Sequence, residues 1–508
     1  LGQTAGHGKH GPGYVYHGVI KEVYVYVLEP RFRHLLGCTQ QPYRPSHRPP
    51  PSLAKGEDLQ MILRHAGWNP ALVPWMTLTE AEVAGLADAL VEFHAQFQTC
   101  FGRTEHRRLG RAYLAGLLSN TAAKSVEPLA LALLDANAVR PLQRFLKSYG
   151  GDHAAMEATH HTLLAQTLAE PDGMLTVDSC EFPKKGTESV GVARQYGGAR
   201  GKVDNCQSGV FVGSSSRKGY GLVTSRLYLP ASWCPPAQAE RRTDTRVPED
   251  LVFQTKPQLA RDLLARLAQT ARFPATWIGC DAVFGADWAF LDAVPPGTAS
   301  FAGIRSNPPV FRTRPRVRVP RYRGRGRRPT KPCVTQGRAE PVGTLAGSKT
   351  CPWTQVVLAE GAKGPIRAEV ACLRVYPAQG GLPREEVWLF VRRLEDGQLK
   401  AAFSNAPADT PLAALCRAAT LRWPIEQCFQ DGKSQVGMDH YEHRSWPAWH
   451  RHMLYVFLAL HFLLRLRLRC KTNAGLDAAA SAGPRAIPYE AESHRLSLTQ
   501  EEAAGVAS

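Results

Sequence analysis

The stretch "MLTVDSC", Met174 to Cys180, is where the pattern of the chain changes from helical to strand-like. Its mainly apolar residues run up to Asp178, which is typical of a short buried strand that ends in a carboxylate. A second stretch, "ATWIGCD", ends in Asp281 in the same way. Because α/β sheets display functional groups at strand ends, both aspartates are candidate functional residues. Either aspartate taken alone is more simply explained as a strand cap that begins a turn.

The residues between these two stretches predict a mixed α/β sheet. Three strand-like runs separated by glycine-rich turns follow Asp178, namely "ESVGVARQY", "NCQSGVFVGSSS" and "YGLVTSRLYLP". A helix rich in leucine and alanine, expected over 257–271, then leads to the strand that ends at Asp281. The order strand, strand, strand, helix, strand is that of a mixed α/β core.

Composition divides the rest of the chain into segments. At 508 residues the chain is longer than one hydrophobic core supports, so several domains are expected. Upstream of the sheet, Thr79 and Glu82 form a capping box, and Leu90, Phe93 and Phe97 continue a helical apolar face. The expected segments are a poorly defined, Gly-, His- and Pro-rich N-terminus at 1–73, a helical domain at 74–170, the first part of the core at 171–304, a β-rich insertion with a basic arm at 305–408, the C-terminal helical part of the core at 409–470 and a disordered tail at 471–508.

A third candidate carboxylate lies in "LRWPIEQCFQDGK", Leu421 to Lys433. Pro424 suits a first helical turn, and at about 100° per residue Arg422, Glu426 and Lys433 fall within about 40° of one another. Glu426 is therefore expected at the edge of a buried helical face, between two cations. A solvated helix with an Arg422–Glu426 ion pair explains this segment equally well.

The charge of the chain indicates a polyanionic partner. There are 62 Lys and Arg against 44 Asp and Glu, a net charge of +18, which favours nucleic acid or an anionic membrane. The apolar run "MLYVFLALHFLL", Met453 to Leu464, is too short to cross a bilayer and contains a histidine, so we expect a buried helix there. No signal peptide is recognisable. Nucleic acid is therefore the leading partner.

The cysteines and histidines give no sign of a structural metal or a disulfide framework. The twelve cysteines are scattered singly, without a CxxC pair, which fits a reducing cytosol. His443, His450 and His452 do not form a closed zinc set, and a packed or DNA-facing helix explains them better.

Three acids from distant parts of one chain suit phosphodiester cleavage. The two-metal route holds two divalent ions roughly 3.5–4 Å apart, one activating the attacking oxygen and one stabilising the leaving oxygen. Carboxylate oxygens favour Mg²⁺ or Mn²⁺, and the like charges repel until a metal ion binds. The flanking cations Arg422 and Lys433 are then candidate phosphate contacts.

Three long blocks resemble a known family. "VDSCEFPKKGTESVGVARQYGGARGKVDNCQSGVFVG", "WIGCDAVFG" and "LRWPIEQCFQDGKSQVGMDHYEHRSWPAWHRH" together resemble the DDE transposases of bacterial insertion sequences, in the branch whose ribonuclease H-like core is interrupted by a β-rich insertion. The likeness runs from about residue 75 to 465. It implies an α/β, ribonuclease H-like fold with a helical N-terminal domain and the β-rich domain inserted in the core.

The resemblance also implies the chemistry of the site. Asp178, Asp281 and Glu426 would form a catalytic triad that holds two Mg²⁺ (or Mn²⁺) ions, hydrolyses DNA at the ends of the element and joins the 3′-hydroxyls to target DNA. A tyrosine, arginine, glutamate, lysine signature of this branch falls on Arg422, Glu426 and Lys433, with Ala419 at the tyrosine position. Ser179 follows Asp178 where many relatives carry a second acid.

Further basic residues are candidate DNA contacts. Those that follow Asp178 are Lys184, Lys185, Arg194 and Lys202, for which a solvated face is an equally good explanation. Nine arginines in the seventeen residues of 312–328, among them Arg323, Arg325 and Arg327, form an arm suited to non-specific phosphate binding, or a disordered basic loop. Trp423, Trp446 and Trp449 are expected in the core, although Trp423 lies next to the triad and leaves base stacking open.

Three functions agree with these observations. The first is an active transposase acting on double-stranded DNA, namely its terminal inverted repeats and the target, as at least a homodimer because two ends must be brought together. The second is a catalytically decayed or domesticated DNA-binding protein, which Ala419 favours. The third is a host nuclease of the same fold that cleaves without joining. All three predict a cytoplasmic protein associated with the nucleoid and not with a membrane.

Overall fold

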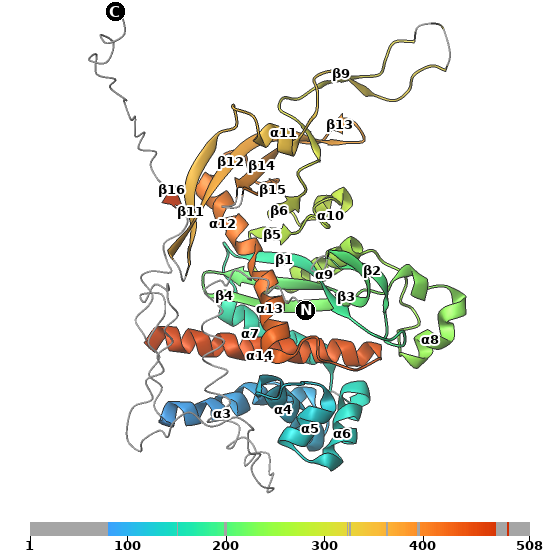
Figure 1. The fold of residues 1–508 in the computed structure, drawn as a ribbon, viewed down its shortest axis with the longest axis vertical. Helices are drawn as coiled ribbons and strands as arrows, with labels where there is room; N and C mark the ends of the chain where they lie inside the picture. Colours follow the sequence, from blue (N-terminus) through green and yellow to red (C-terminus); the bar gives the residue numbers. More distant parts are fainter. Residues whose placement is uncertain are drawn as a thin grey trace, which may run out of the picture.

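The computed structural model describes residues 80–149, 151–197, 201–322, 324, 327–361, 364–393, 397–473 and 485–486. Within them the chain forms one large mixed sheet flanked by helices, with a separate layer of helices at one end (Figure 1). The α/β class expected from the sequence is confirmed. Thr79, the expected N-terminal segment 1–73 and most of the expected tail 471–508 lie outside the described residues.

The helices form the N-terminal layer, cover the faces of the sheet and form the C-terminal end of the fold. They are α3 (Glu80–Ala95), α4 (Thr104–Leu118), α5 (Val126–Leu133), α6 (Val139–Arg144), α7 (His153–Leu168), α8 (Ala239–Asp244), α9 (Lys256–Thr270), α10 (Trp288–Asp292), α11 (Val342–Ala346), α12 (Leu412–Arg422), α13 (Pro424–Val436) and α14 (Trp446–Asn473).

The strands form the sheet and a small separate hairpin. They are β1 (Met174–Pro183), β2 (Ala193–Gly197), β3 (Lys202–Ser216), β4 (Gly219–Leu227), β5 (Trp277–Cys280), β6 (Ala299–Ile304), β7 (Pro309–Phe311), β8 (Arg316–Arg318), β9 (Cys333–Gln336), β10 (Glu340–Pro341), β11 (Trp353–Gly361), β12 (Gly364–Gln379), β13 (Leu382–Pro383), β14 (Val387–Arg393), β15 (Leu399–Ser404) and β16 (Arg485–Ala486).

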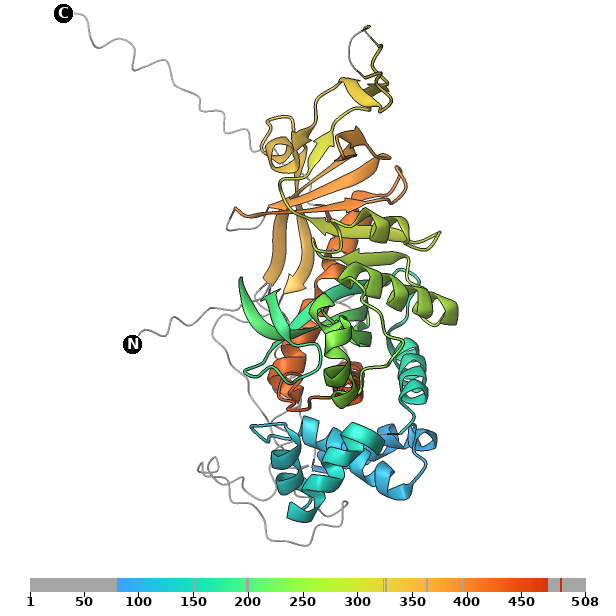
Figure 2. The ribbon, with the colours of Figure 1, turned by 90° about the vertical axis from the view of Figure 1, so that its right-hand side faces the viewer.

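The sheet runs without a break from the expected core into the expected insertion. Its main path is β10-β7-β12-β14-β15-β6-β5-β1-β3-β2, with β4 paired beside β3. The strands β1, β5 and β6 are parallel to one another, whereas β15 joins β6 antiparallel. The β-rich segment after residue 305 therefore extends the same sheet, and its arm around β8 and β9 projects away from it (Figures 1 and 2).

Strand β1 differs from the expectation that Asp178 ends it. The strand continues to Pro183 and stays paired with β3 throughout, with Asp178 opposite Phe211. Only the parallel ladder with β5 ends before Asp178, at Val177 opposite Cys280. Met174 to Val177 are buried on both faces and read as an apolar run, whereas beyond Asp178 buried and half-buried residues alternate. Because of that alternation, the residues after Asp178 form no apolar run, and the sequence alone does not mark them as part of the strand.

The run "ESVGVARQY" was also expected to be a strand from its start, and this was wrong. Strand β2 begins only at Ala193, because the preceding residues form turns. Gly191 in this stretch has a φ of 72°, in the left-handed region that favours glycine, so the chain cannot be extended there.

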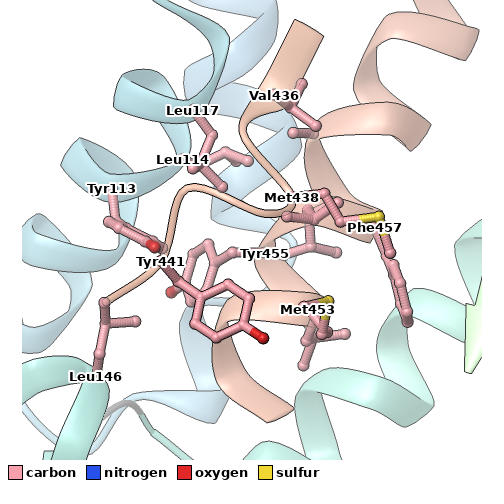
Figure 3. Close-up of a cluster of buried hydrophobic side chains, with 14 of the residues drawn as sticks. Tyr113, Leu114, Leu117, Leu146, Val436, Met438, Tyr441, Met453, Tyr455 and Phe457 are labelled. Carbon is pink, nitrogen blue, oxygen red and sulfur yellow. The ribbon is translucent and has the colours of Figure 1, made fainter. Parts of the chain in front are cut away.

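Helix α14 joins the N-terminal helices to the sheet. Its apolar run is buried, as expected, and contacts β4 on one side and α4 on the other. In Figure 3, Tyr113 of α4 lies near Tyr455 of α14, and Phe457 of α14 lies beside Met438 in the same buried cluster. No helix among the described residues is long and apolar enough to span a membrane.

Candidate active site

The joint between α12 and α13 positions the third acid. Pro424 occupies the first turn of α13, as expected, where its missing N–H removes no helical hydrogen bond. The hydroxyl of Ser215 on β3 donates a hydrogen bond of 2.7 Å to the carbonyl of Leu421. Gly213 on the same strand lets α13 sit close, since a Cβ there would lie 3.3 Å from Ile425 Cγ1. The joint is therefore fixed to β3.

Arg422 and Glu426 form an ion pair across this joint. The Nη2 atom of Arg422 lies 2.7 Å from Oε1 of Glu426, whose side chain is 46% exposed. The stem of Arg422 passes close to β5, because a Cβ at Gly279 would lie 3.2 Å from Arg422 Cγ. Burial lowers the pKa of Arg422, but Glu426, Asp178 and Asp281 outweigh it and raise the pKa overall. One guanidinium thus acts on all three carboxylates.

Asp178 is the most strongly perturbed of the three acids. Burial raises its pKa well above the ordinary value, and the charge of Asp281, acting in the same direction, outweighs Arg422. Glu426 raises the pKa further, and a 2.7 Å hydrogen bond from the backbone N–H of Ser179 lowers it. Two neighbouring carboxylates that cannot both ionise without cost are typical of a cation site.

Asp281 directly follows β5, as expected, and it caps a turn there. Its Oδ1 accepts backbone hydrogen bonds from Val283 at 3.0 Å and Phe284 at 3.3 Å, so it does begin a turn. Burial still raises its pKa, against these two bonds and the charges of Arg422 and Lys256. The turn fixes the carboxylate beside β1, next to Asp178.

The donor set fits a hard divalent cation, but the three acids do not form a closed cluster. Among the described residues, no group of three or more His, Cys, Asp or Glu side chains is arranged to hold a metal ion. Glu426 is instead paired with Arg422. The donors are nevertheless oxygen atoms only, which Mg²⁺ and Mn²⁺ prefer, and a divalent cation would relieve the effect of the Asp281 charge on the pKa of Asp178.

Three charged residues near these acids were missed by the sequence analysis. Lys256 Nζ donates a 3.3 Å hydrogen bond to Oε1 of Glu181 on β1. Lys256 opens α9, where a capping box between Thr255 and Gln258 fixes the helix start. That capping box was the signal that would have placed Lys256 in the first turn of a helix. Arg392 comes from β14, and the charges of Arg422 and Glu426 act on it; no local pattern marks it.

Two of the expected DNA contacts are engaged within the fold. Lys433 Nζ donates to the carbonyl of Glu181 at 3.1 Å and lies 5.5 Å from the centre of the Phe182 ring. Lys184 Nζ donates to the carbonyl of Tyr441 at 2.9 Å and lies 3.6 Å from the centre of that ring. Burial lowers the pKa of Lys184 to about 8. Both lysines fasten the segment after Asp178 to the C-terminal helices.

Other expected DNA contacts lie on the surface. Exposed side chains are those of Lys185, Arg194, Lys202 and Arg327. Tyr196 and Val203 are paired across β2 and β3 and are 62% and 51% exposed, so this hairpin presents apolar and basic groups together. Arg323 and Arg325 lie outside the described residues.

The tryptophans and histidines divide between core and surface. Trp446 and Trp449 are buried, as expected, but Trp423 is 38% exposed, so its expected burial was wrong. It occupies the junction between two helices, where neither helix covers it. His452 packs in the core with Nδ1 2.7 Å from the Tyr113 hydroxyl, and Ala419 is buried in α12.

Comparison with known proteins identifies the family. A family model described as DDE superfamily endonuclease matches residues 96–365, more than half of the chain. The chain belongs to this superfamily. The matched residues include Asp178 and Asp281 and end before Glu426. The search of curated proteins gives no match.

Membership of the DDE superfamily fixes the broad chemistry. The mixed sheet is the ribonuclease H-like fold of these endonucleases, and the chain is an enzyme of the nuclease and transposase type. DDE endonucleases generally use divalent metal ions. The two aspartates brought together on β1 and after β5 lie within the matched residues.

Proposed function

We propose that this protein is the DNA transposase of a bacterial insertion sequence, which cleaves the ends of its element and joins the 3′-hydroxyls to target DNA. The observation that carries the proposal is the convergence of Asp178, Asp281 and Glu426 on one guanidinium, that of Arg422. The grouping of these acids is electrostatically costly, since burial raises the pKa of Asp178 and Asp281, and the charges of Asp281 and Glu426 raise that of Asp178 further. Metal-dependent phosphoryl transfer explains why they are there.

In this proposal Asp178, Asp281 and Glu426 hold two Mg²⁺ or Mn²⁺ ions. When bound, the ions activate the attacking oxygen and stabilise the leaving oxygen of the phosphodiester. Arg422 balances the carboxylates and, on release from Glu426, is available for a DNA phosphate. Lys256 and Arg392 add positive charge from α9 and β14 on two sides of the acids.

The exposed hairpin β2–β3 and the arginine arm supply the DNA-binding surface. Arg194 and Lys202 stand beside Tyr196 and Val203 on the hairpin, a combination that suits phosphate and sugar contacts. The arm carries its arginines away from the sheet, and Arg312 and Arg314 near its base already pair with Glu340 and Glu385. Arg327, at the far part of the arm, is exposed. We assign non-specific phosphate binding to the arm.

The test uses linear DNA that carries the inverted repeats flanking the gene, with Mg²⁺. We expect wild type to cut at the repeat ends and to join them to target DNA. Glu426→Gln removes a charged metal ligand and should lower cutting more than about a hundredfold. Glu249→Gln, an exposed glutamate in the turn before α9, is the matched control and should cut normally.

The same assay separates the alternatives. Cutting without any joined product would favour a host nuclease over a transposase. Binding of the repeats without cutting by wild type would favour a decayed DNA-binding protein, which Ala419 at the signature tyrosine position and the Arg422–Glu426 pair support. Equal cutting by wild type and Glu426→Gln would remove Glu426 from the triad.

The proposed reaction also requires at least a dimer on DNA, because two element ends must be brought together. Light scattering of the protein with end DNA should give a mass of two or more protein chains. A single chain per complex would oppose the transposase proposal.

A further inference from the structure

A cavity of about 240 Å³ lies apart from the candidate active site, at the sheet edge formed by β4. It is lined by residues of α7, α9 and the first turn of α14, which come together around β4, and it is partly open to solvent. The lining residues are His153, Glu157, Ser225, Arg226, Arg266, Trp446, Pro447, His450 and Arg451.

The cavity lies at a different strand from Asp178 and Asp281, and one of its three arginines, Arg226, is on the other face of the sheet. Ser225 is opposite Phe211, which is opposite Asp178, so one strand separates the cavity from β1. Arg226 follows Ser225 and points to the opposite face, because side chains alternate along a strand. A ligand of the cavity is therefore held independently of the three acids.

Positive charge dominates the lining. Arg226, Arg266 and Arg451 face one carboxylate, that of Glu157. The Oε1 atom of Glu157 accepts a 2.5 Å hydrogen bond from Thr224 and lies 4.0 Å from His161 Nε2. Within the described residues, none of the three arginines forms an ion pair with Glu157 or with another acid. The three arginines outnumber the one carboxylate of the lining, although the charges of Glu157, Asp262 and Asp250 act favourably on Arg226.

Two of the lining arginines have lowered pKa values. Burial and then the charge of Arg266 lower the pKa of Arg226. Burial and the charge of Arg246 lower the pKa of Arg451. The Nη1 atom of Arg451 donates to the carbonyl of Leu146 at 2.7 Å, but its buried Nε has no partner among the described residues. Clustered like charges with an unsatisfied donor are costly unless an anion binds.

The remaining wall fixes the shape of the cavity and adds to its polarity. His450 is held as a neutral ring, since Nδ1 donates to the carbonyl of Trp446 at 2.9 Å and Nε2 accepts from the N–H of Leu227 at 3.4 Å. His153 Nδ1 is buried and has no partner in the described part of the chain. Trp446 and Pro447 open α14, so the positive end of that helix dipole also faces the cavity.

We propose that this cavity is a second, metal-independent site that binds a phosphate group. Arginine guanidinium groups match phosphate oxygens in geometry and charge, and three of them converge here. The volume is just below the roughly 300–1,000 Å³ of ordinary ligand pockets, so the site suits a single phosphate, alone or on a mononucleotide or DNA strand. A mononucleotide and a DNA strand present the same phosphate group and differ only in the rest of the molecule.

The test compares two arginines of one helix. Arg266→Gln removes a lining cation, whereas Arg261→Gln removes an exposed arginine of α9 that does not line the cavity. Both changes are on the surface of the helix, so both variants should fold. Binding is measured by calorimetry on the full chain with inorganic phosphate, with adenosine monophosphate and with a short DNA duplex. A chelator is present, so that metal ions at the triad cannot bind phosphate.

We expect phosphate to bind wild type and Arg261→Gln alike and to bind Arg266→Gln at least about tenfold more weakly, the effect of one charge-assisted hydrogen bond. The same tenfold difference seen with the duplex alone would also support the site and would assign it to a DNA phosphate. Equal binding by the two variants with all three probes, or an equal loss in both, would overturn the proposal.

Discussion

Arg422 is the residue on which the account of the site depends. Its guanidinium pairs with Glu426 at 2.7 Å, and its charge lowers the pKa of both Asp178 and Asp281. In the absence of metal ions this single cation partly neutralises the three carboxylates, which two divalent ions would neutralise more fully. The site is therefore partly balanced and still electrostatically strained, because burial keeps the pKa of both aspartates raised.

This strain predicts a stabilising loss-of-function variant. The pKa of Asp178 is raised in the folded protein, so its contribution to stability is lost as the pH rises through that value. Asp178→Asn removes the charge at nearly the same volume. At neutral pH and without metal ions, Asp178→Asn should melt at a higher temperature than wild type, although it should not cleave DNA.

Differential scanning calorimetry with and without Mg²⁺ checks this prediction. Wild type should gain stability from Mg²⁺ and the variant should not. Asp250→Asn, an exposed aspartate, serves as the control and should behave like wild type. A lower melting temperature of metal-free Asp178→Asn would contradict the account of Asp178 as a strained ligand.

The close approach of Arg422 to Gly279 indicates that packing, as well as charge, holds the Arg422 side chain in place. A Cβ at Gly279 would lie 2.5 Å from Met174 Sδ and 3.2 Å from Arg422 Cγ. Gly279→Ala should therefore displace Arg422, cost about 1–3 kcal/mol of stability and lower DNA cleavage without removing any charged group. Gly102→Ala, which meets no atom within 4 Å, is the control. Cleavage by Gly279→Ala at the wild-type rate would show that Arg422 does not depend on this contact.

At the scale of elements, the joint between α12 and α13 determines where Glu426 lies. The joint is tied to β3 by the hydrogen bond from Ser215 to Leu421 and by Ile425 packed over Gly213. Glu426 follows one turn later on the exposed side of α13. Small changes at the joint should therefore move the carboxylate relative to the two aspartates.

Ser215→Ala tests this dependence. Loss of the buried hydrogen bond to the Leu421 carbonyl should cost about 1 kcal/mol in urea unfolding and should also lower the rate of DNA cleavage. Ser208→Ala on the same strand loses only a 3.5 Å contact to Glu181 and is the control for stability. If Ser215→Ala is destabilised but cleaves DNA at the wild-type rate, this hydrogen bond does not affect the position of Glu426 in catalysis.

Elements with a complete local pattern could be predicted from the sequence. Helix α9 and the buried run of α14 follow from their apolar residues, and the start of α13 follows from Pro424. Asp281 could be placed because β5 is short and buried on both faces. In each case one short segment contains the whole signal.

Features that depend on distant segments could not be predicted. Strand β1 continues past Asp178 because β3 still pairs with it, which the residues of β1 alone do not reveal. Trp423 is exposed because it falls between two helices, and Lys184 is engaged because Tyr441 lies against it. Arg392 approaches the acids because β15 and β6 join the inserted strands to the core.

For the whole molecule, the net charge of +18 predicts strongly salt-dependent DNA binding. The logarithm of the association constant should fall linearly with the logarithm of the salt concentration, by about 0.9 for each phosphate contact. Arg194→Gln, on the exposed hairpin, should reduce this slope by about one contact. Fluorescence anisotropy over a range of salt concentrations measures it, and an unchanged slope would remove Arg194 from the interface.

Buried histidines predict that the fold loses stability in acid. Burial lowers the pKa of His94, His160 and His443 to about 4, of His450 and His452 to about 3, and of His461 to about 2. These rings are neutral when folded and charged when unfolded below about pH 6.5, so stability is lost as the pH falls from there towards 4.

The buried carboxylates act in the opposite direction but are fewer. Asp178, Asp281 and Asp431 have raised pKa values, about 6 for Asp431, so they favour the folded state at low pH. Among the described residues, burial also lowers the pKa of His153 and His161, so these histidines outnumber the three aspartates and a net loss in acid results. Urea unfolding of metal-free protein at several pH values between 4 and 6.5 should show stability rising with pH, and a flat or falling profile would contradict it.

The central claim is that Asp178, Asp281 and Glu426 bind divalent metal ions together, and a calorimetric Mn²⁺ titration tests it most directly. Wild type and the control Glu249→Gln should bind Mn²⁺ alike. Asp178→Asn, Asp281→Asn and Glu426→Gln should each bind it at least about tenfold more weakly. Mn²⁺ binding by all three triad variants with the affinity of wild type would contradict the claim.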